Sequence, residues 1–181
     1  VQVSKFGQLL ILIPSIIATM VFPYSADKTQ SFSLEKVQQL CKTVTMFFIP
    51  VALLFVLSGY NVLPFIFGKG FNLMYVALLL YLPGFFALSI ISILAAYLAA
   101  QKFLQVNLGA SILALIIVII GDVFLIPLLG INAAAAVSSV AYIACGCYLL
   151  HIFKVKYNCS PTSFLYFRKE DFFYILKQLT K

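Results

Sequence analysis

The sequence predicts an all-α integral membrane protein, a helical bundle with about five transmembrane helices. Hydrophobic residues make up 64% of its 181 residues, charged residues make up only 9%, and the mean hydropathy is +1.10. A soluble globular domain is about 45–50% apolar and about 25% charged. The apolar residues also form runs that suit membrane-spanning helices and are too long for the strands of a membrane barrel. Composition and run length together indicate a polytopic membrane protein.

The apolar runs that can cross a membrane follow one another with short connections. A helix needs about 20 residues to cross a hydrocarbon core of about 30 Å. The predicted spans are residues 6–22, 44–60, 75–100, 105–128 and 132–153. We therefore expect residues 1–153 to form one transmembrane bundle.

Prolines lie within or at the edge of most of these spans. Pro14 and Pro50 fall inside the first and second spans, Pro83 is followed by Gly84 in the third, and Pro127 lies near the end of the fourth. A proline removes one backbone hydrogen bond and kinks a helix. Prolines in successive spans favour the broken or bending helices that transporters place around a central path. A purely structural role is the alternative.

The last two spans predict a helical hairpin, and residues 104–139 contain it. Pro127 suits a helix end, where its missing N–H costs little. Gly130 permits the chain to reverse, and Asn132 is the predicted N-cap of the next helix. The four alanines at 133–136 let that helix approach a neighbour closely.

The lysines and arginines predict the orientation of the bundle. The loops at 24–43 and 101–104 and the tail at 154–181 hold ten of the twelve lysines and arginines. Lys5 and Lys69 lie on the opposite face. The positive-inside rule therefore places the C-terminus in the cytoplasm and the start of this chain outside. The same rule explains the net charge of +7 without nucleic acid, since no basic patch interleaved with aromatic residues is present.

The tail at 154–181 differs in kind from the spans. In its later part, SFLYFRKEDFFYILKQLTK, apolar residues recur at helical spacing and charged residues fall between them. This pattern is typical of an amphipathic helix that lies on the membrane surface. A partly disordered tail is the alternative.

The sequence predicts neither an enzyme nor a metal or cofactor site. The four cysteines and the single histidine, His151, do not have the spacing of metal ligands. Cys145 and Cys147 lie in an apolar span and are interpreted as small hydrophobic residues. No nucleophile with a base, pair of general acids or phosphate-binding loop accompanies them. Coupling to a proton or sodium gradient stays open.

Asp122 is the acid that falls within a predicted span. A charged carboxylate inside lipid costs several kcal/mol, so its side chain should face a partner or water. One hypothesis is a group that responds to protons or cations and couples ion flow to substrate movement. The alternative is an aspartate near the interface that hydrogen-bonds to a neighbouring helix.

Other polar residues in or beside the spans are candidates for a hydrophilic cavity or for substrate contact. They are Gln8, Asn61, Gln101, Asn107, Lys36 and Lys42. The amides could line a cavity for sugar, and the two lysines flank the second span where a lipid pyrophosphate would enter. The alternatives are hydrogen bonds between helices for the amides and contacts with anionic headgroups for the lysines.

Three stretches resemble the multidrug/oligosaccharidyl-lipid/polysaccharide exporter superfamily, and within it the polysaccharide transporter family. They are SIIATMVFPYSAD at 15–27, FGKGF at 67–71, and LIPLLGIN at 125–132 followed by alanines. The family pattern at the third stretch is Leu-Ile-Pro, two residues, Gly-Ile, one residue, Gly-Ala-Ala. This chain departs from it with Ala133 in place of glycine and with Asp122 where members often have asparagine.

The resemblance implies the C-terminal part of a two-lobe transporter with about twelve to fourteen helices, whose first lobe is absent from this chain. It implies a flippase in the cell inner (plasma) membrane that moves a lipid-linked oligosaccharide by alternating access, an O-antigen unit or a capsular or exopolysaccharide repeat. Expected partners are that substrate, membrane lipids and polysaccharide-assembly proteins, without nucleic acid. The alternatives are a peptidoglycan-precursor flippase, a cation-coupled multidrug antiporter, a membrane-embedded polysaccharide polymerase and a structural subunit.

Overall fold

The computed structural model describes residues 2–26, 33–67 and 72–165, and this part of the chain is helical without strands. The helices are α1 (Gln2–Ala26), α2 (Leu34–Phe67), α3 (Asn72–Ala100), α4 (Leu104–Leu129), α5 (Ile131–Tyr157) and the short α6 (Thr162–Leu165). The predicted all-α bundle is confirmed. The amphipathic helix predicted late in the tail lies outside the described residues.

Four of the described helical segments are long and apolar enough to cross a membrane. They are Leu34–Tyr60, Tyr75–Ala100, Leu104–Leu129 and Ile131–Tyr157. The apolar stretch described in α1, Ile11–Ser25, is shorter. The chain is therefore a multi-pass membrane protein, and the predicted spans each fall on one of the five long helices.

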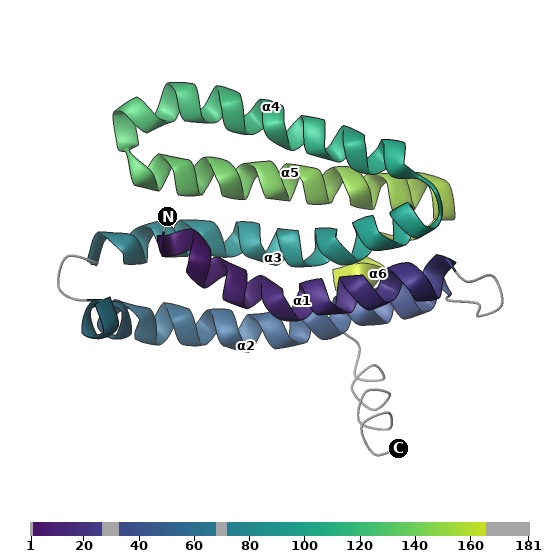
Figure 1. Cartoon of the computed structure of the whole chain (residues 1–181), viewed down its shortest axis with the longest axis horizontal. Coiled ribbons are helices and arrows are strands. Elements are labelled where there is room, and N and C mark those ends of the chain that lie inside the picture. Colours follow the sequence, from purple (N-terminus) through teal and green to yellow (C-terminus); the bar gives the residue numbers. More distant parts are fainter. Residues whose placement is uncertain (1, 27–32, 68–71, 166–181) are drawn as a thin grey trace, which may run out of the picture.

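The helices form a layered bundle with α3 at its centre (Figure 1). α3 contacts α1 and α2 on one side and α5 on the other, and α4 lies outside α5. In the most apolar window of α3 half of the residues are buried, whereas none is buried in that of α4. A helix that is apolar all round and exposed suits lipid, because lipid tails cover its surface.

The main core lies where α3 meets α1, α2 and α5. Ile93, Leu94 and Leu98 of α3 and Leu149 and Phe153 of α5 are almost completely buried in it. Burying such side chains in a close-packed interior aligns the helices and fixes which face each presents to its neighbour.

α2 begins earlier than the sequence predicted, because part of the connection expected at 24–43 is helical. The helix starts at Leu34, about three turns before the predicted span. Val37, Cys41 and Val44 are buried at helical spacing on its inner face. Hydropathy predicts only the segment that lipid covers. The helix continues into the polar region because apolar residues at helical spacing are buried there against neighbouring helices.

The α4–α5 hairpin confirms the predicted reversal at Gly130 but not its capping. Gly130 has φ 60° and ψ −138°, a backbone conformation open to glycine, and its N–H donates to the Ile126 carbonyl at 2.9 Å. Asn132 is not the N-cap, since Gly130 holds that position without a side-chain hydrogen bond. The prediction was wrong because α4 continues past Pro127 to Leu129, so that one residue is left to make the turn.

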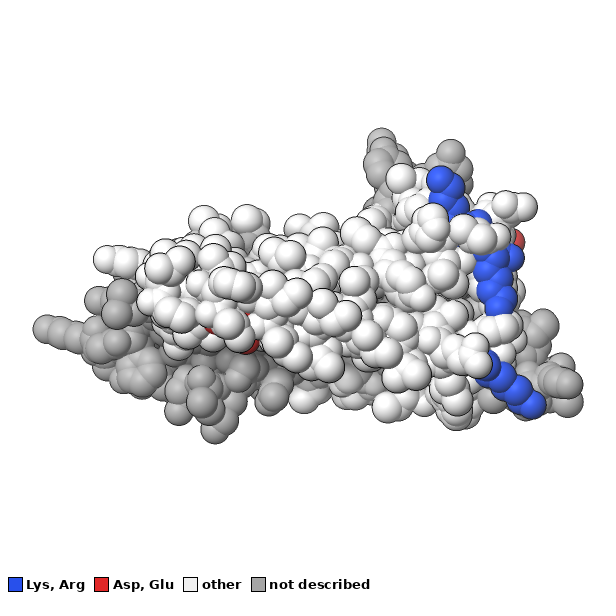
Figure 2. Space-filling view, turned by 90° about the horizontal axis from the view of Figure 1, so that it is seen from above, with Lys and Arg blue, Asp and Glu red and all other residues white. Residues whose placement is uncertain are grey.

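The described lysine side chains gather at one end of the bundle, which we call the basic end (Figure 2). They are Lys36, Lys42, Lys102, Lys154 and Lys156. The start of α2, the turn between α3 and α4, and the last turn of α5 meet there. The Lys156 ammonium lies over the Phe103 ring and joins two of these segments by a cation–π contact.

Candidate functional site

α3 is one continuous helix, and a hydroxyl from α5 contacts it where Pro83 leaves a gap in its backbone hydrogen bonds, a gap that we call the break. Pro83 lies inside α3 and has no N–H to give to the helix. The next residue, Gly84, donates its N–H to Ser139 Oγ at 3.2 Å, and that hydroxyl donates to the Leu80 carbonyl at 2.5 Å. The N–H of Gly84 and the carbonyl of Leu80 are the two groups that pair with each other in an unbroken α-helix. Ser139 therefore hydrogen-bonds to both members of one pair in the hydrogen-bond ladder of α3.

The two helices approach each other closely at this point, and only glycine fits there. A Cβ added to Gly84 would lie 2.7 Å from both Cα and Oγ of Ser139. Ser139 is 5% exposed, so the bridge lies in the interior of the bundle. Small residues at a crossing let membrane helices come this near.

Sequence reasoning found Pro83 but missed Ser139. The signal that could have found it is the run of small residues from Ala133 to Ser139 at the start of the last span. Alternate positions of this run, Ala133, Ala135, Val137 and Ser139, are buried in the structure. A hydroxyl on such a small-residue face is a candidate partner for a proline break in a facing helix.

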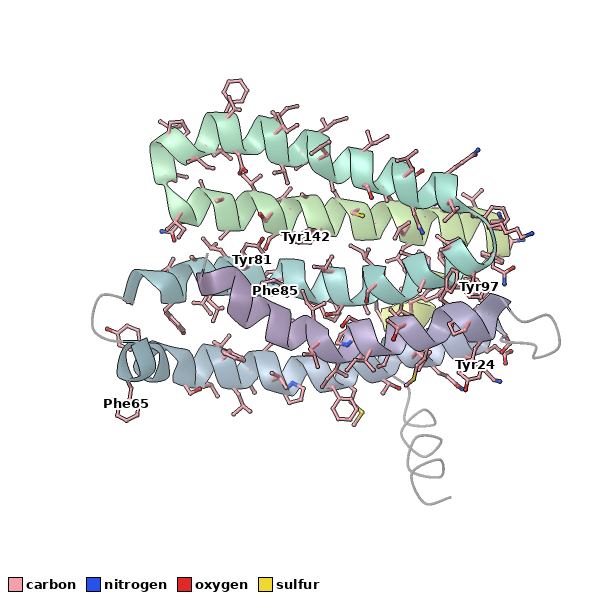
Figure 3. The ribbon with its side chains drawn as sticks, in the orientation of Figure 1. Tyr24, Phe65, Tyr81, Phe85, Tyr97 and Tyr142 are labelled. Atoms are coloured by element: carbon pink, nitrogen blue, oxygen red, sulfur yellow. The ribbon has the colours of Figure 1, made fainter. Side chains whose placement is uncertain are left out.

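Aromatic residues surround the break. The centroid of the Tyr81 ring lies 4.5 Å from that of Phe85 on the same helix and 6.3 Å from that of Tyr142 on α5. Figure 3 shows Tyr142 opposite Tyr81, in the layer between α3 and α5. Tyrosine has an apolar ring and a hydroxyl, so this cluster adds polar groups to an otherwise apolar crossing.

Two apolar grooves meet at the break, and we call them together the Pro83 trough. The larger, of about 570 Å³, lies between α2 and α3 and is lined by Ile49, Leu53 and others of similar character. The smaller, of about 210 Å³, lies between α3 and α5 and ends at Leu165 of α6. Pro83 and Phe86 line both. The two grooves therefore adjoin each other at Pro83 and Phe86 of α3.

Asp122 lies partly buried in the α4–α5 hairpin, about two turns before the turn at Gly130. One of its carboxylate oxygens, Oδ1, is buried and has no hydrogen-bond partner among the described residues. The preceding residue, Gly121, lies against α5, where a Cβ would meet Val137 Cγ1 at 2.5 Å. A buried acceptor without a donor costs free energy, so this oxygen is a candidate to receive a proton or a cation.

The remaining candidate amides lie apart from each other. Gln101 Nε2 donates to the Ser25 carbonyl of α1 at 3.3 Å, and Asn107 Nδ2 donates to the Ala95 carbonyl of α3 at 2.9 Å. Both bonds join neighbouring helices near the basic end. Gln8 and Asn61 lie in α1 and α2, in stretches whose side chains are outside the description.

The charged candidates and the other prolines occupy separate places. Lys36 and Lys42 lie in the first turns of α2, and each already has an interaction within the chain. Pro14, Pro50 and Pro127 lie inside α1, α2 and α4. The structure thus places Ser139 beside the Pro83–Gly84 pair. Of the six cavity candidates, Lys36, Lys42, Gln101 and Asn107 lie at or near the basic end, away from this pair.

Among the described residues, no group of three or more His, Cys, Asp or Glu side chains could hold a metal ion. Comparison of the chain with protein-family models, with curated proteins and with solved structures finds no match. The site is therefore interpreted from its own geometry.

Proposed function

We propose that this bundle works as one lobe of a membrane transporter that moves a lipid-linked oligosaccharide by alternating access. The observation that carries the proposal is the break in α3, which Ser139 spans from α5. A central helix with a joint at mid-length lets the two ends of a bundle open and close in turn, as broken helices do in transporters.

The joint is well placed for such a movement. α3 contacts α1, α2 and α5, so a change in its bend moves the α1–α2 side relative to the α4–α5 hairpin. The hydroxyl of Ser139 can leave the ladder because Gly84 N–H and Leu80 C=O can then pair with each other, while the hydroxyl can bond to a carbonyl of its own helix. The two arrangements exchange one set of hydrogen bonds for another, which suits a two-state element.

The substrate class follows from the resemblance of residues 67–71 and 125–132 to the polysaccharide transporter family. In this mechanism the sugar crosses the membrane between lobes while its lipid chain stays in the bilayer. Apolar outer surfaces, such as that of α4, suit a carrier whose substrate remains anchored in lipid.

Flipping can be measured with a polyprenyl diphosphate disaccharide that carries an NBD fluorophore on its sugar. Vesicles with and without the protein are loaded with this probe, and dithionite is added outside. Dithionite destroys the fluorophores in the outer leaflet only. We expect the protein to expose nearly all of the probe to dithionite, whereas protein-free vesicles keep their inner-leaflet fluorescence. Protection of the inner leaflet in both samples would show that the proposed function is wrong.

The Ser139→Ala variant connects flipping to the joint. It removes the bridge while α3 keeps a direct hydrogen bond, so the bundle should fold but spend its time in one arrangement. We expect flipping to slow several-fold. Ser138→Ala, at the next position on α5, is the matched control and should flip the probe at the original rate. Equal flipping rates in the Ser139→Ala and Ser138→Ala variants would show that the Ser139 bridge has no role in transport.

A cation-coupled antiporter of the same superfamily is the second candidate, and the unpartnered Oδ1 of Asp122 favours it. In an antiporter the carboxylate exchanges a proton or cation for substrate, so Asp122→Asn should abolish transport driven by a pH or sodium gradient. The measurement is uptake of ethidium into vesicles with each gradient imposed in turn. Full gradient-driven uptake by Asp122→Asn, or no uptake by the unaltered protein, would remove this candidate.

A further inference from the structure

The walls of the Pro83 trough lead to lysines at the basic end. On α2, Ile49, Leu53 and Val56 line the groove, and Lys42 lies on the same face because 42, 49, 53 and 56 follow helical spacing. These apolar residues form a stripe of about two turns, and the lysine continues it toward the start of α2.

The wall on α5 has the same design. Ile143, Cys147 and Leu150 line the smaller groove, and Lys154 lies one turn further along the same face. The Lys154 side chain is exposed. Two helices thus each present an apolar stripe that ends in a lysine at the same end of the bundle.

α6 borders the trough at this end. Leu165 of α6 lines the smaller groove, and Ser163 Oγ accepts a hydrogen bond from Gln38 Nε2 of α2 at 3.1 Å. The Phe164 side chain is completely buried and meets the Phe153 ring of α5 at 5.4 Å between ring centroids. α6 therefore joins α2 to α5 at the level of the two lysines.

We propose that the Pro83 trough binds one anionic phospholipid of the bilayer. An acyl chain lies along the apolar grooves, and the phosphate lies at the basic end between Lys42 and Lys154. The trough is lined by apolar side chains, which match an acyl chain, and the lysines at its end match the charge of the headgroup. Lys42 also has an interaction within the chain, but an ammonium carries three N–H donors and can keep both partners.

A long lysine side chain suits this position. Its methylene stem lies along apolar surface while its charge reaches the headgroup region. The lipid would then contact both sides of the break in α3 through Pro83 and Phe86, which line both grooves. Binding of this lipid does not depend on the proposed transport function, and its test uses no transport substrate.

The chain contains no tryptophan, so one introduced tryptophan reports on its own surroundings. Ile49→Trp places the reporter in the trough at an exposed position. The protein is reconstituted in phosphatidylcholine vesicles with increasing shares of phosphatidylglycerol, and either lipid is brominated in turn. The ratio of the two quenching curves gives the preference of the site for the anionic lipid. Since one lysine near an anionic lipid contributes about fivefold, we expect a preference of at least that size.

Leu108→Trp is the matched control, because Leu108 is exposed on α4 and lies a similar distance inward from Lys102 at the same end. It reports the general enrichment of anionic lipid around a basic end and should show a much smaller preference. The double variant Lys42→Gln with Lys154→Gln should bring the trough reporter down to the level of the control. Lys102→Gln should leave the trough reporter unchanged.

Equal preferences at Ile49→Trp and Leu108→Trp would overturn the proposal, as would a trough preference that survives loss of both lysines. Added polyprenyl diphosphate tests a different occupant. If it relieves quenching by brominated phosphatidylglycerol at an equimolar amount, the trough belongs to a transport substrate and the assignment to a phospholipid is wrong. If the protein does not flip the probe but the trough keeps its lysine-dependent preference for anionic lipid, the proposed transport function is wrong and the proposed lipid site is supported.

Discussion

At the scale of single residues, Ser139 and Gly84 act as one unit. The serine hydroxyl accepts from the N–H of Gly84 and donates to the carbonyl of Leu80, beside Pro83, and it reaches both because Gly84 has no side chain. A break inside a membrane bundle is tolerated where a neighbouring helix satisfies the freed backbone groups. The close crossing of α3 and α5 is therefore a condition for this hydroxyl bridge.

The Gly84→Ala variant tests this unit. Its Cβ would lie 2.7 Å from Cα and Oγ of Ser139, and the backbone on that side cannot turn away. We expect a loss of about 1–3 kcal/mol in the free energy of unfolding, as overpacking gives. The measurement is reversible unfolding by dodecyl sulfate in mixed micelles, followed by helical circular dichroism.

Gly146→Ala on α5 is the control for this change. A Cβ there would find its nearest neighbour, Ile91 Cγ1, at 3.7 Å, which is ordinary contact distance. The stability of this variant should stay within about 0.5 kcal/mol of the original. Similar losses at both glycines would mean that general crowding, rather than the crossing at Ser139, sets the cost.

The sequence predicted only half of this site. Pro83 could be predicted from the sequence because a proline inside an apolar span always removes one backbone hydrogen bond. Ser139 could not, because the partner of a broken helix depends on which helix packs against it and in which register. Asn132 shows the same limit, since it has the residue type of an N-cap but lies two positions after the N-cap, Gly130.

At the scale of helices, the existence of each long element could be predicted but not where it ends. The spans at 75–100 and 105–128 agree closely with the helical segments because both ends are marked by polar or turn residues. The start of α2 was misplaced because burial of Val37 and Cys41 by tertiary packing extends the helix beyond the lipid-covered segment.

The hairpin between α4 and α5 depends on Gly130 for its backbone and on no side-chain cap. Its φ of 60° with ψ of −138° is costly for other residues, and nothing lies within 4 Å of an added Cβ. Gly130→Ala should therefore destabilise the protein by about 1–3 kcal/mol through backbone strain alone. Unfolding in mixed micelles measures the loss.

The Asn132→Ala variant tests whether side-chain capping, in addition to the backbone conformation of Gly130, stabilises the same turn. Loss of a true N-cap costs about 1 kcal/mol, but Asn132 lies inside α5 and its Oδ1 is buried without a partner among the described residues. We expect no loss of stability, or a slight gain, since a buried acceptor without a donor disappears. A loss of stability as large as that of Gly130→Ala would show that the asparagine side chain stabilises the turn.

At the scale of the whole molecule, the two ends of the bundle differ in charge. The described lysine side chains lie at one end, and the turn at Gly130 lies at the other (Figures 1 and 2). The sequence could predict this difference because helices that cross a membrane in turn return every second connection to the same side. The order of the helices in space needed the structure, since apolar faces in lipid look alike in sequence.

The difference in charge also predicts which side of the membrane each end faces. Lysines are retained in the cytoplasm during insertion, so the basic end should lie inside and the Gly130 turn outside. Two single-cysteine proteins, made after replacing the four native cysteines by serine or alanine, carry Lys102→Cys and Leu128→Cys, both at exposed positions. In intact cells a membrane-impermeant maleimide should label the protein with Leu128→Cys and spare the one with Lys102→Cys. Permeabilised cells should allow both to react, which shows that each thiol is accessible. The reverse pattern in intact cells would invert the bundle, because the short turns between α3, α4 and α5 leave no freedom to place one end alone on the other side.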